Sequence, residues 1–224
     1  MNKERVHANG IRSESILNQM RMDIITGKYP KGKILPESAL ANHFKVSRGP
    51  IREAMKSLES EELLEILPNG RKRVLGFSAK QVKDLYDFRE LVEIRAVEYI
   101  FEEEVNFFSP ILDVLQRIEN SALGRTPGET DWFDLDVQFH RAIIESSGNH
   151  ALLKAWNINS PIMYALLVMN TTKDYREQYI SEFYDKHRKL FELMVTKNKE
   201  CFEYIRIHIL DARALSDGLI KSYC

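Results

Sequence analysis

The hydrophobic pattern of the first third of the chain predicts three short helices. Apolar residues spaced three and four apart indicate helices over residues 13–26 and 37–44, with turn residues after each. Ser47 then starts a third helix over residues 48–61, because a serine hydroxyl can accept a hydrogen bond from a free backbone N–H of the first turn. A short helix, a tight turn and a second helix form a helix-turn-helix arrangement.

The helix predicted over residues 48–61 has two different faces. One face is apolar, and the other carries basic residues that recur every four positions, which are Arg48, Arg52 and Lys56. The second helix of a helix-turn-helix protein enters the DNA major groove, where arginine contacts guanine edges and lysine contacts phosphates. We therefore expect these three residues, and Ser47 at the start of the helix, to contact DNA.

A β-hairpin is predicted directly after this helix. Strand-like runs over residues 63–67 and 71–75 flank the turn Pro68-Asn69-Gly70. The return strand starts with three consecutive cations, which are Arg71, Lys72 and Arg73. Such a run is either a solvated surface or a phosphate contact, and the neighbouring basic helix face favours DNA. The hairpin is then the wing of a winged helix.

Charge divides the chain at the end of this hairpin. Residues 1–76 contain 14 Lys+Arg and 9 Asp+Glu, whereas residues 77–224 contain 18 and 24, so a net charge of −1 conceals a basic first third. A basic segment joined to an acidic one is typical of a protein that binds a polyanion. We expect a DNA-binding domain over residues 1–76 and a helical domain over residues 77–224.

The overall composition is that of an ordinary globular protein. Hydrophobic residues make up 44% of the 224 residues and charged residues 29%, and no apolar run approaches the roughly 18 residues of a membrane span. Cys201 and Cys224 have no metal-type spacing, so we expect two free thiols. These features predict a cytoplasmic protein without a membrane partner.

The remaining two thirds of the chain contain no strand alternation and no glycine-rich phosphate loop. Helical periodicity and breaks at Gly, Pro and Asn predict six helices, over residues 79–104, 109–123, 130–147, 149–171, 174–196 and 198–221. The fold class is therefore mostly α, with a winged helix-turn-helix domain followed by an all-α six-helix bundle. Ligand sites in such bundles lie between facing helices.

Four potential metal ligands lie on three of these predicted helices. Asp136 and His140 are four residues apart and share a helix face, while His187 and His208 lie midway along the last two helices among apolar positions. One carboxylate and three imidazoles suit zinc first, with nickel, manganese or iron as alternatives. Taken without further information, the histidines are equally well explained as hydrogen-bonded core residues.

The N-terminal third resembles a known family of bacterial transcription regulators. The runs Ile-Thr-Gly-Lys-Tyr-Pro-Lys-Gly-Lys-Ile-Leu-Pro-Glu over residues 25–37 and Val-Ser-Arg-Gly-Pro-Ile-Arg-Glu-Ala-Met-Lys-Ser-Leu over 46–58, with Leu40-Ala41 between them, are similar to the winged-helix signature of the GntR family. The resemblance spans about residues 12–76 and rests on several spaced features together.

This resemblance implies particular DNA contacts. Arg48 and Arg52 match the DNA-contacting arginines of the family, and Gly70 matches the glycine at the tip of the wing. Ser38 stands where some members have a further DNA-contacting arginine, so the operator sequence stays open.

Residues 79–221 resemble the helical FCD effector domain of the FadR subfamily, and six helices point to its VanR-like branch. The resemblance lies in Asp136-x3-His140, followed by Ala-Ile-Ile-Glu-Ser-Ser-Gly-Asn over residues 142–149, then His187 and His208. Members with this set bind a divalent metal through the aspartate and the three histidines. The resemblance therefore implies a metal centre between the helices.

Two further residues are candidates for an effector site. Arg89 lies in a stretch that resembles the start of the FCD domain, where an arginine lines the effector cavity in many members, and such a guanidinium would bind a carboxylate effector. The alternative for Arg89 is a surface ion pair with Glu93, four residues later. Asn159 is a candidate for lining the same cavity.

These features favour a ligand-responsive transcription regulator and not an enzyme. We expect a homodimer that binds a palindromic operator in double-stranded DNA, as a repressor, with a small carboxylate effector and a metal in the helical domain. The alternative is a metal-dependent hydrolase with an accessory DNA-binding domain, because three His and one Asp with open metal positions can activate water.

Overall fold

A computed structural model describes residues 3–102, 107–126, 130–169 and 173–223. The chain divides into two compact units, one containing residues 3–78 and the other residues 79–222. Each unit has its own core, and each is described separately below. Among the helices that the structure describes, none combines the length and the apolar character that crossing a bilayer requires.

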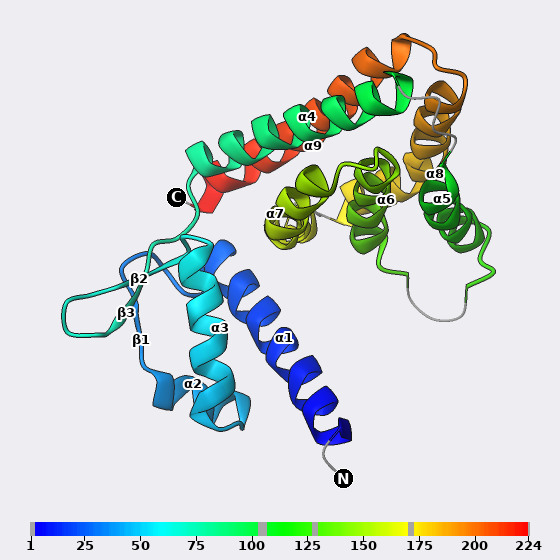
Figure 1. The fold of residues 1–224 in the computed structure, drawn as a ribbon. Helices are drawn as coiled ribbons and strands as arrows, with labels where there is room; N and C mark the ends of the chain where they lie inside the picture. The colour runs from blue at the N-terminus through cyan, green and yellow to red at the C-terminus, as the bar shows by residue number, and fades with distance from the viewer. Residues whose placement is uncertain (1–2, 103–106, 127–129, 170–172, 224) are drawn as a thin grey trace. The chain divides into compact units, whose positions relative to one another are not determined.

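The first unit is built on three helices, α1 (Lys3–Ile25), α2 (Glu37–Phe44) and α3 (Arg48–Ser60) (Figure 1). Helices α1 and α2 both pack against α3. The most deeply buried side chains in the core of this unit are 0% exposed, which are Met20, Ile51, Met55, Leu58 and Leu63. Burial of the apolar face of α3 leaves its basic face outward.

A tight turn joins α2 to α3. Lys45 adopts a left-handed conformation with φ 54°, and the Val46 N–H donates to the Ala41 carbonyl at 3.0 Å. This geometry ends α2 with the backbone bonding typical of helix C-termini. The helix-turn-helix predicted from the sequence is therefore present, with α2 and α3 within one residue of the expected bounds.

The sheet of the first unit contains three strands, β1 (Ile34–Leu35), β2 (Leu64–Ile66) and β3 (Lys72–Val74), in the order β1-β3-β2. Both pairings are antiparallel, with Ile34 opposite Arg73 and Leu64 opposite Val74. Gly70 at the hairpin tip has φ 77°, a conformation that glycine adopts without steric cost. The wing predicted from residues 63–75 is thus confirmed as a hairpin.

Two features of the first unit differ from the sequence expectation. Strand β1 was not expected, because two residues are too few to show a period-two pattern. Helix α1 begins at Lys3, ten residues before the predicted start at residue 13. Its first turns contain few apolar positions, so hydrophobic periodicity could not reveal them.

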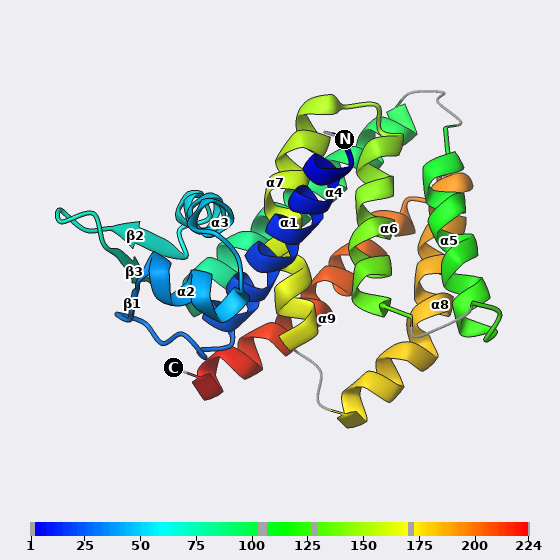
Figure 2. The same ribbon diagram turned by 90° about the horizontal axis from the view of Figure 1, so that it is seen from below.

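The second unit is all-helical, as predicted (Figures 1 and 2). Its six described helices are α4 (Ala79–Glu102), α5 (Ser109–Ala122), α6 (Trp132–Ser146), α7 (His150–Met169), α8 (Lys173–Val195) and α9 (Glu200–Tyr223). Each predicted bound that falls on a described residue lies within two residues of the observed one. Residues 104 and 171, the predicted ends of two helices, fall outside the described residues.

Local chemistry explains several of these boundaries. Pro110 occupies the first turn of α5, where its missing N–H costs nothing. The Asp131 side chain caps α6 by accepting a hydrogen bond from the Asp134 N–H at 3.0 Å. Helices α4 and α9 lie side by side, and the Tyr86 and Ser216 hydroxyls share a buried hydrogen bond of 2.9 Å between them.

Candidate metal centre and DNA-binding surface

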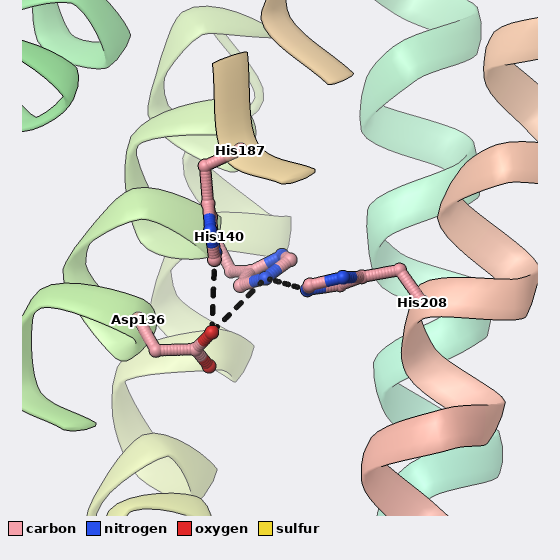
Figure 3. Close-up of side chains that lie close together, drawn as sticks. All are labelled: Asp136, His140, His187 and His208. Carbon is pink, nitrogen blue, oxygen red and sulfur yellow. Dashed lines mark hydrogen bonds and ion pairs between the residues drawn. The ribbon is translucent and has the colours of Figure 1, made fainter. Parts of the chain in front are cut away.

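Three helices bring the four predicted metal ligands together in the second unit. Asp136 and His140 come from α6, His187 from α8 and His208 from α9 (Figure 3). One potential ligand atom from each residue lies within 4.8 Å of the others. Residues separated by up to 72 positions thus converge on one point between helices, where the sequence placed them only on separate elements.

The local sequence explains why these polar side chains point inward. Asp136 and His140 are one helical turn apart on the buried face of α6 and are 3% and 0% exposed. Aromatic rings enclose His187, with the Phe183 and Phe139 ring centroids 4.1 and 4.7 Å from its own. The apolar surroundings exclude water, which strengthens any electrostatic interaction within the cluster.

Hydrogen bonds orient the imidazoles toward a common point. The Nδ1 of His187 donates to the Phe183 carbonyl at 2.7 Å, and its Nε2 then faces Asp136 Oδ1 at 3.2 Å. The Nε2 atoms of His140 and His208 lie 3.0 Å apart. Each of these three rings therefore directs one nitrogen into the cluster.

The charges around the cluster favour the protonation states that metal binding requires. Burial alone would raise the pKa of Asp136, but nearby positive charge, including that of Arg89, and the hydrogen bond with His187 outweigh burial, and the pKa lies well below its usual range. Burial lowers the pKa values of His140 and His208. An ionised Asp136 beside His140 and His208 rings that favour the neutral form is the arrangement in which these three residues can bind a divalent ion.

The donor set fits a transition metal. Three imidazole nitrogens and one carboxylate oxygen are typical ligands of zinc and of the neighbouring first-row divalent ions. Calcium and magnesium, in contrast, prefer sites made of oxygen ligands. The structure thus contains a possible His/Asp metal site, and the identity of the ion is a matter for the proposal below.

Arg89, the predicted effector residue, lies beside this cluster and is only 1% exposed. Its Nε donates to Glu93 Oε1 at 2.7 Å, and its Nη2 lies 3.8 Å from Asp136 Oδ2. The ion pair with Glu93 that the sequence offered as a surface feature therefore exists, but it is buried. Nη2 has no hydrogen-bond partner among the described residues.

Glu93 is a functional candidate that the sequence interpretation missed. It is 0% exposed, and its Oε2 lies 2.6 Å from Nδ1 of His140. It shares the buried stripe of α4 with Leu85 and Val92, so a carboxylate among apolar positions was the available signal. Asn159 is half-buried on α7 and donates to the Ala155 carbonyl of its own helix at 2.9 Å. Its role in an effector cavity stays a prediction.

The basic face of α3 lies in the first unit and is accessible. Arg48, Arg52 and Lys56 are all exposed. Arg52 donates from Nη2 to Glu37 Oε2 at 3.0 Å, and this carboxylate raises the pKa of the guanidinium. The ion pair between α2 and α3 thus holds Arg52, which was predicted to contact bases, at the surface.

Two cations of the wing form ion pairs with glutamates. Gly70 and Arg71 are exposed at the tip. Lys72 pairs with Glu59 at 2.8 Å, and Arg73 pairs with Glu65 at 2.6 Å. These glutamates partly neutralise the run of three cations, for which the sequence left a solvated surface and a phosphate contact as alternatives.

The capping hydrogen bond expected from the Ser47 hydroxyl is absent. Ser47 occupies the N-cap position of α3 with extended backbone angles, but its hydroxyl makes no capping hydrogen bond. The helix start is exposed, so water can satisfy its first N–H groups instead. The hydroxyl is thus not engaged by the helix it begins.

Comparison with known proteins agrees with both halves of this structure. Residues 12–74 match the family described as bacterial regulatory proteins, gntR family, and residues 84–211 match the FCD domain. The chain belongs to the GntR family. Its helical unit, in which the His/Asp cluster lies, is an FCD domain, as in the FadR subfamily.

Relatives of this GntR-family chain are regulators. It is 30% identical over 187 residues to the gluconate operon transcriptional repressor of Bacillus licheniformis, covering 81% of this chain and 75% of that protein. The repressor of the same name from Bacillus subtilis is 29% identical over 197 residues, covering 86% and 78%. A transcriptional regulator GntR from Rhodococcus sp. RHA1 has the same fold, with a TM-score of 0.63 at 20% identity over 92% and 98% of the two chains.

These findings favour DNA-binding regulation over catalysis. The chain is a transcription regulator and not an enzyme, in line with its relatives. The alternative of a metal-dependent hydrolase with an accessory DNA-binding domain is not favoured.

Proposed function

We propose that this GntR-family chain is a metal-containing, ligand-responsive repressor that binds a palindromic operator as a homodimer in the cytoplasm. The observation that carries the proposal is the buried cluster of Asp136, His140, His187 and His208 with Arg89 beside it. A regulator that only bound DNA would have no need of a polar cluster inside its helical unit, since buried polar groups are costly.

The four clustered residues would hold the metal, with zinc as the first choice and nickel, manganese or iron as alternatives. The bound ion would supply positive charge and open coordination positions for an oxygen-bearing ligand. Three of the four ligands lie in apolar or fully buried surroundings, where an ionised ligand oxygen is otherwise unfavourable.

The effector is proposed to be a small carboxylate. The guanidinium of Arg89 is buried, and its Nη2 lacks a hydrogen-bond partner among the described residues, although two carboxylates lie near it. An unpaired donor in a buried position favours a further acceptor, and a carboxylate suits the planar guanidinium. Asn159 is proposed to line the same site.

DNA binding is proposed to use α3 and the wing. Arg48 and Arg52 would read bases in the major groove, while Lys56 and Ser47 would contact the backbone. The tip of the wing would contact phosphates through Gly70, Arg71, Lys72 and Arg73. One such head makes few base contacts, so two heads on paired half-sites explain specific binding.

Helix α4 offers a physical connection between the two functions. It carries Arg89 and Glu93, and it begins at Ala79, directly after the strand β3 and a connection over residues 75–78. An effector can change DNA affinity only by the difference in its own affinity for the DNA-bound and free arrangements. Ligand contacts to Arg89 act on the helix that continues from the wing.

The first test is the metal content of untagged protein purified without chelator, measured by elemental mass spectrometry. We expect close to one equivalent in the wild type and a loss of metal in His187→Ala. His150→Ala is the matched control, because His150 is exposed and outside the cluster. If the wild type contains no metal, even after incubation with zinc, nickel or manganese, the proposed metal site is wrong.

The second test concerns the effector and the DNA together. A duplex selected from random sequence by the purified protein serves as the operator probe, and a panel of small carboxylates is added to the complex. We expect at least one compound to change the affinity for this duplex in the wild type and not in Arg89→Lys. If no carboxylate alters the affinity, the proposed effector class is wrong.

A further inference from the structure

The carboxylate of Glu93 connects α4 to the His/Asp cluster. Its side chain is fully buried, and its two oxygens have different partners. Oε1 accepts a hydrogen bond from Arg89 Nε at 2.7 Å, and Oε2 lies 2.6 Å from Nδ1 of His140. Glu93 is not itself one of the four clustered residues.

This contact determines which nitrogen of His140 carries the proton. Glu93 accepts a hydrogen bond from the Arg89 guanidinium at Oε1, and its Oε2 lies at hydrogen-bond distance from Nδ1 of His140, so the carboxylate acts as an acceptor toward both neighbours. The proton of a neutral His140 ring must then be on Nδ1. The lone pair of Nε2 is left facing the cluster, 3.0 Å from His208 Nε2.

His187 also has a hydrogen-bond partner at Nδ1 and directs Nε2 into the cluster, but its partner is a backbone carbonyl. Its Nδ1 donates to the backbone carbonyl of Phe183 at 2.7 Å, and its Nε2 faces Asp136. Histidines that ligate metals usually donate their second ring N–H to a carboxylate or a backbone carbonyl, which fixes both tautomer and orientation. In this cluster, His140 has a carboxylate partner and His187 has a backbone carbonyl partner.

We propose that Glu93 is a positioning residue of the metal centre, which holds His140 in the tautomer and orientation that present Nε2 to the ion. This inference rests on the proposed metal site. Arg89 completes the arrangement, because its guanidinium compensates the charge of the buried carboxylate. The metal centre thus extends beyond its four ligands to an ion pair on α4.

The experiment compares Glu93→Gln with the wild type. Zinc affinity is measured by competition with a chelating dye, and folding is checked by circular dichroism. We expect the zinc dissociation constant of Glu93→Gln to rise by about 10–100-fold. Glu98→Gln is the matched control, because Glu98 lies on the same helix in an exposed ion pair with Arg95, and its zinc affinity should not change.

The outcomes separate this inference from the proposed metal site. A wild type that binds no zinc overturns the metal centre and the role of Glu93 with it. A wild type that binds zinc and a folded Glu93→Gln with an affinity within twofold of it overturns only the role of Glu93.

A second measurement does not depend on the variant folding. Nitrogen NMR of histidine-labelled, metal-free wild type reports the protonated ring nitrogen of His140, with the signal assigned by its loss in His140→Asn. We expect the proton on Nδ1. A signal showing the proton on Nε2 would contradict the positioning role, whatever the behaviour of Glu93→Gln.

Discussion

Arg52 on α3 and Glu37 at the start of α2 form an ion pair in which Nη2 and Oε2 are 3.0 Å apart. The Arg52 side chain nevertheless remains 68% exposed. The pair therefore holds the guanidinium at the surface of the helix-turn-helix without burying it, which leaves its remaining donors available. A surface pair of this kind contributes little to stability, so its effects should appear in DNA binding.

Replacing Arg52 by alanine should weaken binding to the selected operator by about 10–100-fold, because the proposed bidentate contact to guanine would be lost. Binding to random DNA should fall far less. The measurement is fluorescence anisotropy with both duplexes at one fixed salt concentration. Arg188→Ala is the control, since Arg188 is an exposed arginine of α8 in an ion pair with Glu192. Equal losses on both duplexes would show that Arg52 contacts only the backbone.

Arg71 at the tip of the wing should behave differently. It is exposed and belongs to the proposed phosphate-contacting set, so Arg71→Ala should reduce affinity for all DNA sequences to a similar extent. The slope of log affinity against log salt should become shallower by about 1. Titrations at several salt concentrations measure this slope, and an unchanged slope would place Arg71 away from phosphate.

The sequence predicted the helices well because their signals are local. The apolar spacing of α3 and the turn at Gly70 each involve residues only a few positions apart. The pairing of β1 with β3 depends on residues almost forty positions apart, such as Ile34 and Arg73, and no local pattern shows it.

The candidate site was predictable in its residues but not in its surroundings. Asp136 and His140 could be paired from helical spacing alone. The burial of Glu93 could not be predicted from spacing, because an Arg and a Glu four residues apart form the same ion pair at a surface as in a core. Only the packing of α6 against α4 decides that this pair meets His140.

Metal removal should destabilise the helical unit. The proposed ligands lie on three helices, and an ion that binds only the folded state adds about 2.7 kcal/mol at a hundredfold excess over its dissociation constant. This corresponds to a rise in Tm of about 5–10 °C for a domain of this size. Scanning calorimetry with and without zinc measures the shift. His208→Ala should lose it and His150→Ala should keep it, and a zinc effect that survives in His208→Ala would point to another site.

Arg89→Ala should be among the most destabilising substitutions in the metal-free protein. It leaves the buried carboxylates of Glu93 and Asp136 without their cationic partner, and removing one member of a buried pair typically costs about 3–5 kcal/mol. Arg95→Ala on the same helix is the control, because Arg95 is 41% exposed and its pairs are at the surface. Urea unfolding compares the two, and equal midpoints would contradict the buried ion pair.

Cys201 should be protected from alkylation in the folded protein. Its side chain is 0% exposed, and burial raises the pKa of its thiol to about 12. In the unfolded chain a thiol ionises near pH 8.5, and only the thiolate reacts. Burial of the neutral thiol therefore stabilises the fold fully below that pH, and the contribution is lost as the pH rises toward 12.

The test uses Cys224→Ser, so that Cys201 is the sole thiol of the chain. Iodoacetamide is added at pH 9 with and without denaturing urea, and mass spectrometry follows the labelling. We expect rapid labelling in urea and labelling at least tenfold slower without it, at a rate that follows transient unfolding. Equal rates in both conditions would mean that the N-terminal part of α9 is open to solvent and that the packing around His208 is looser than the structure shows.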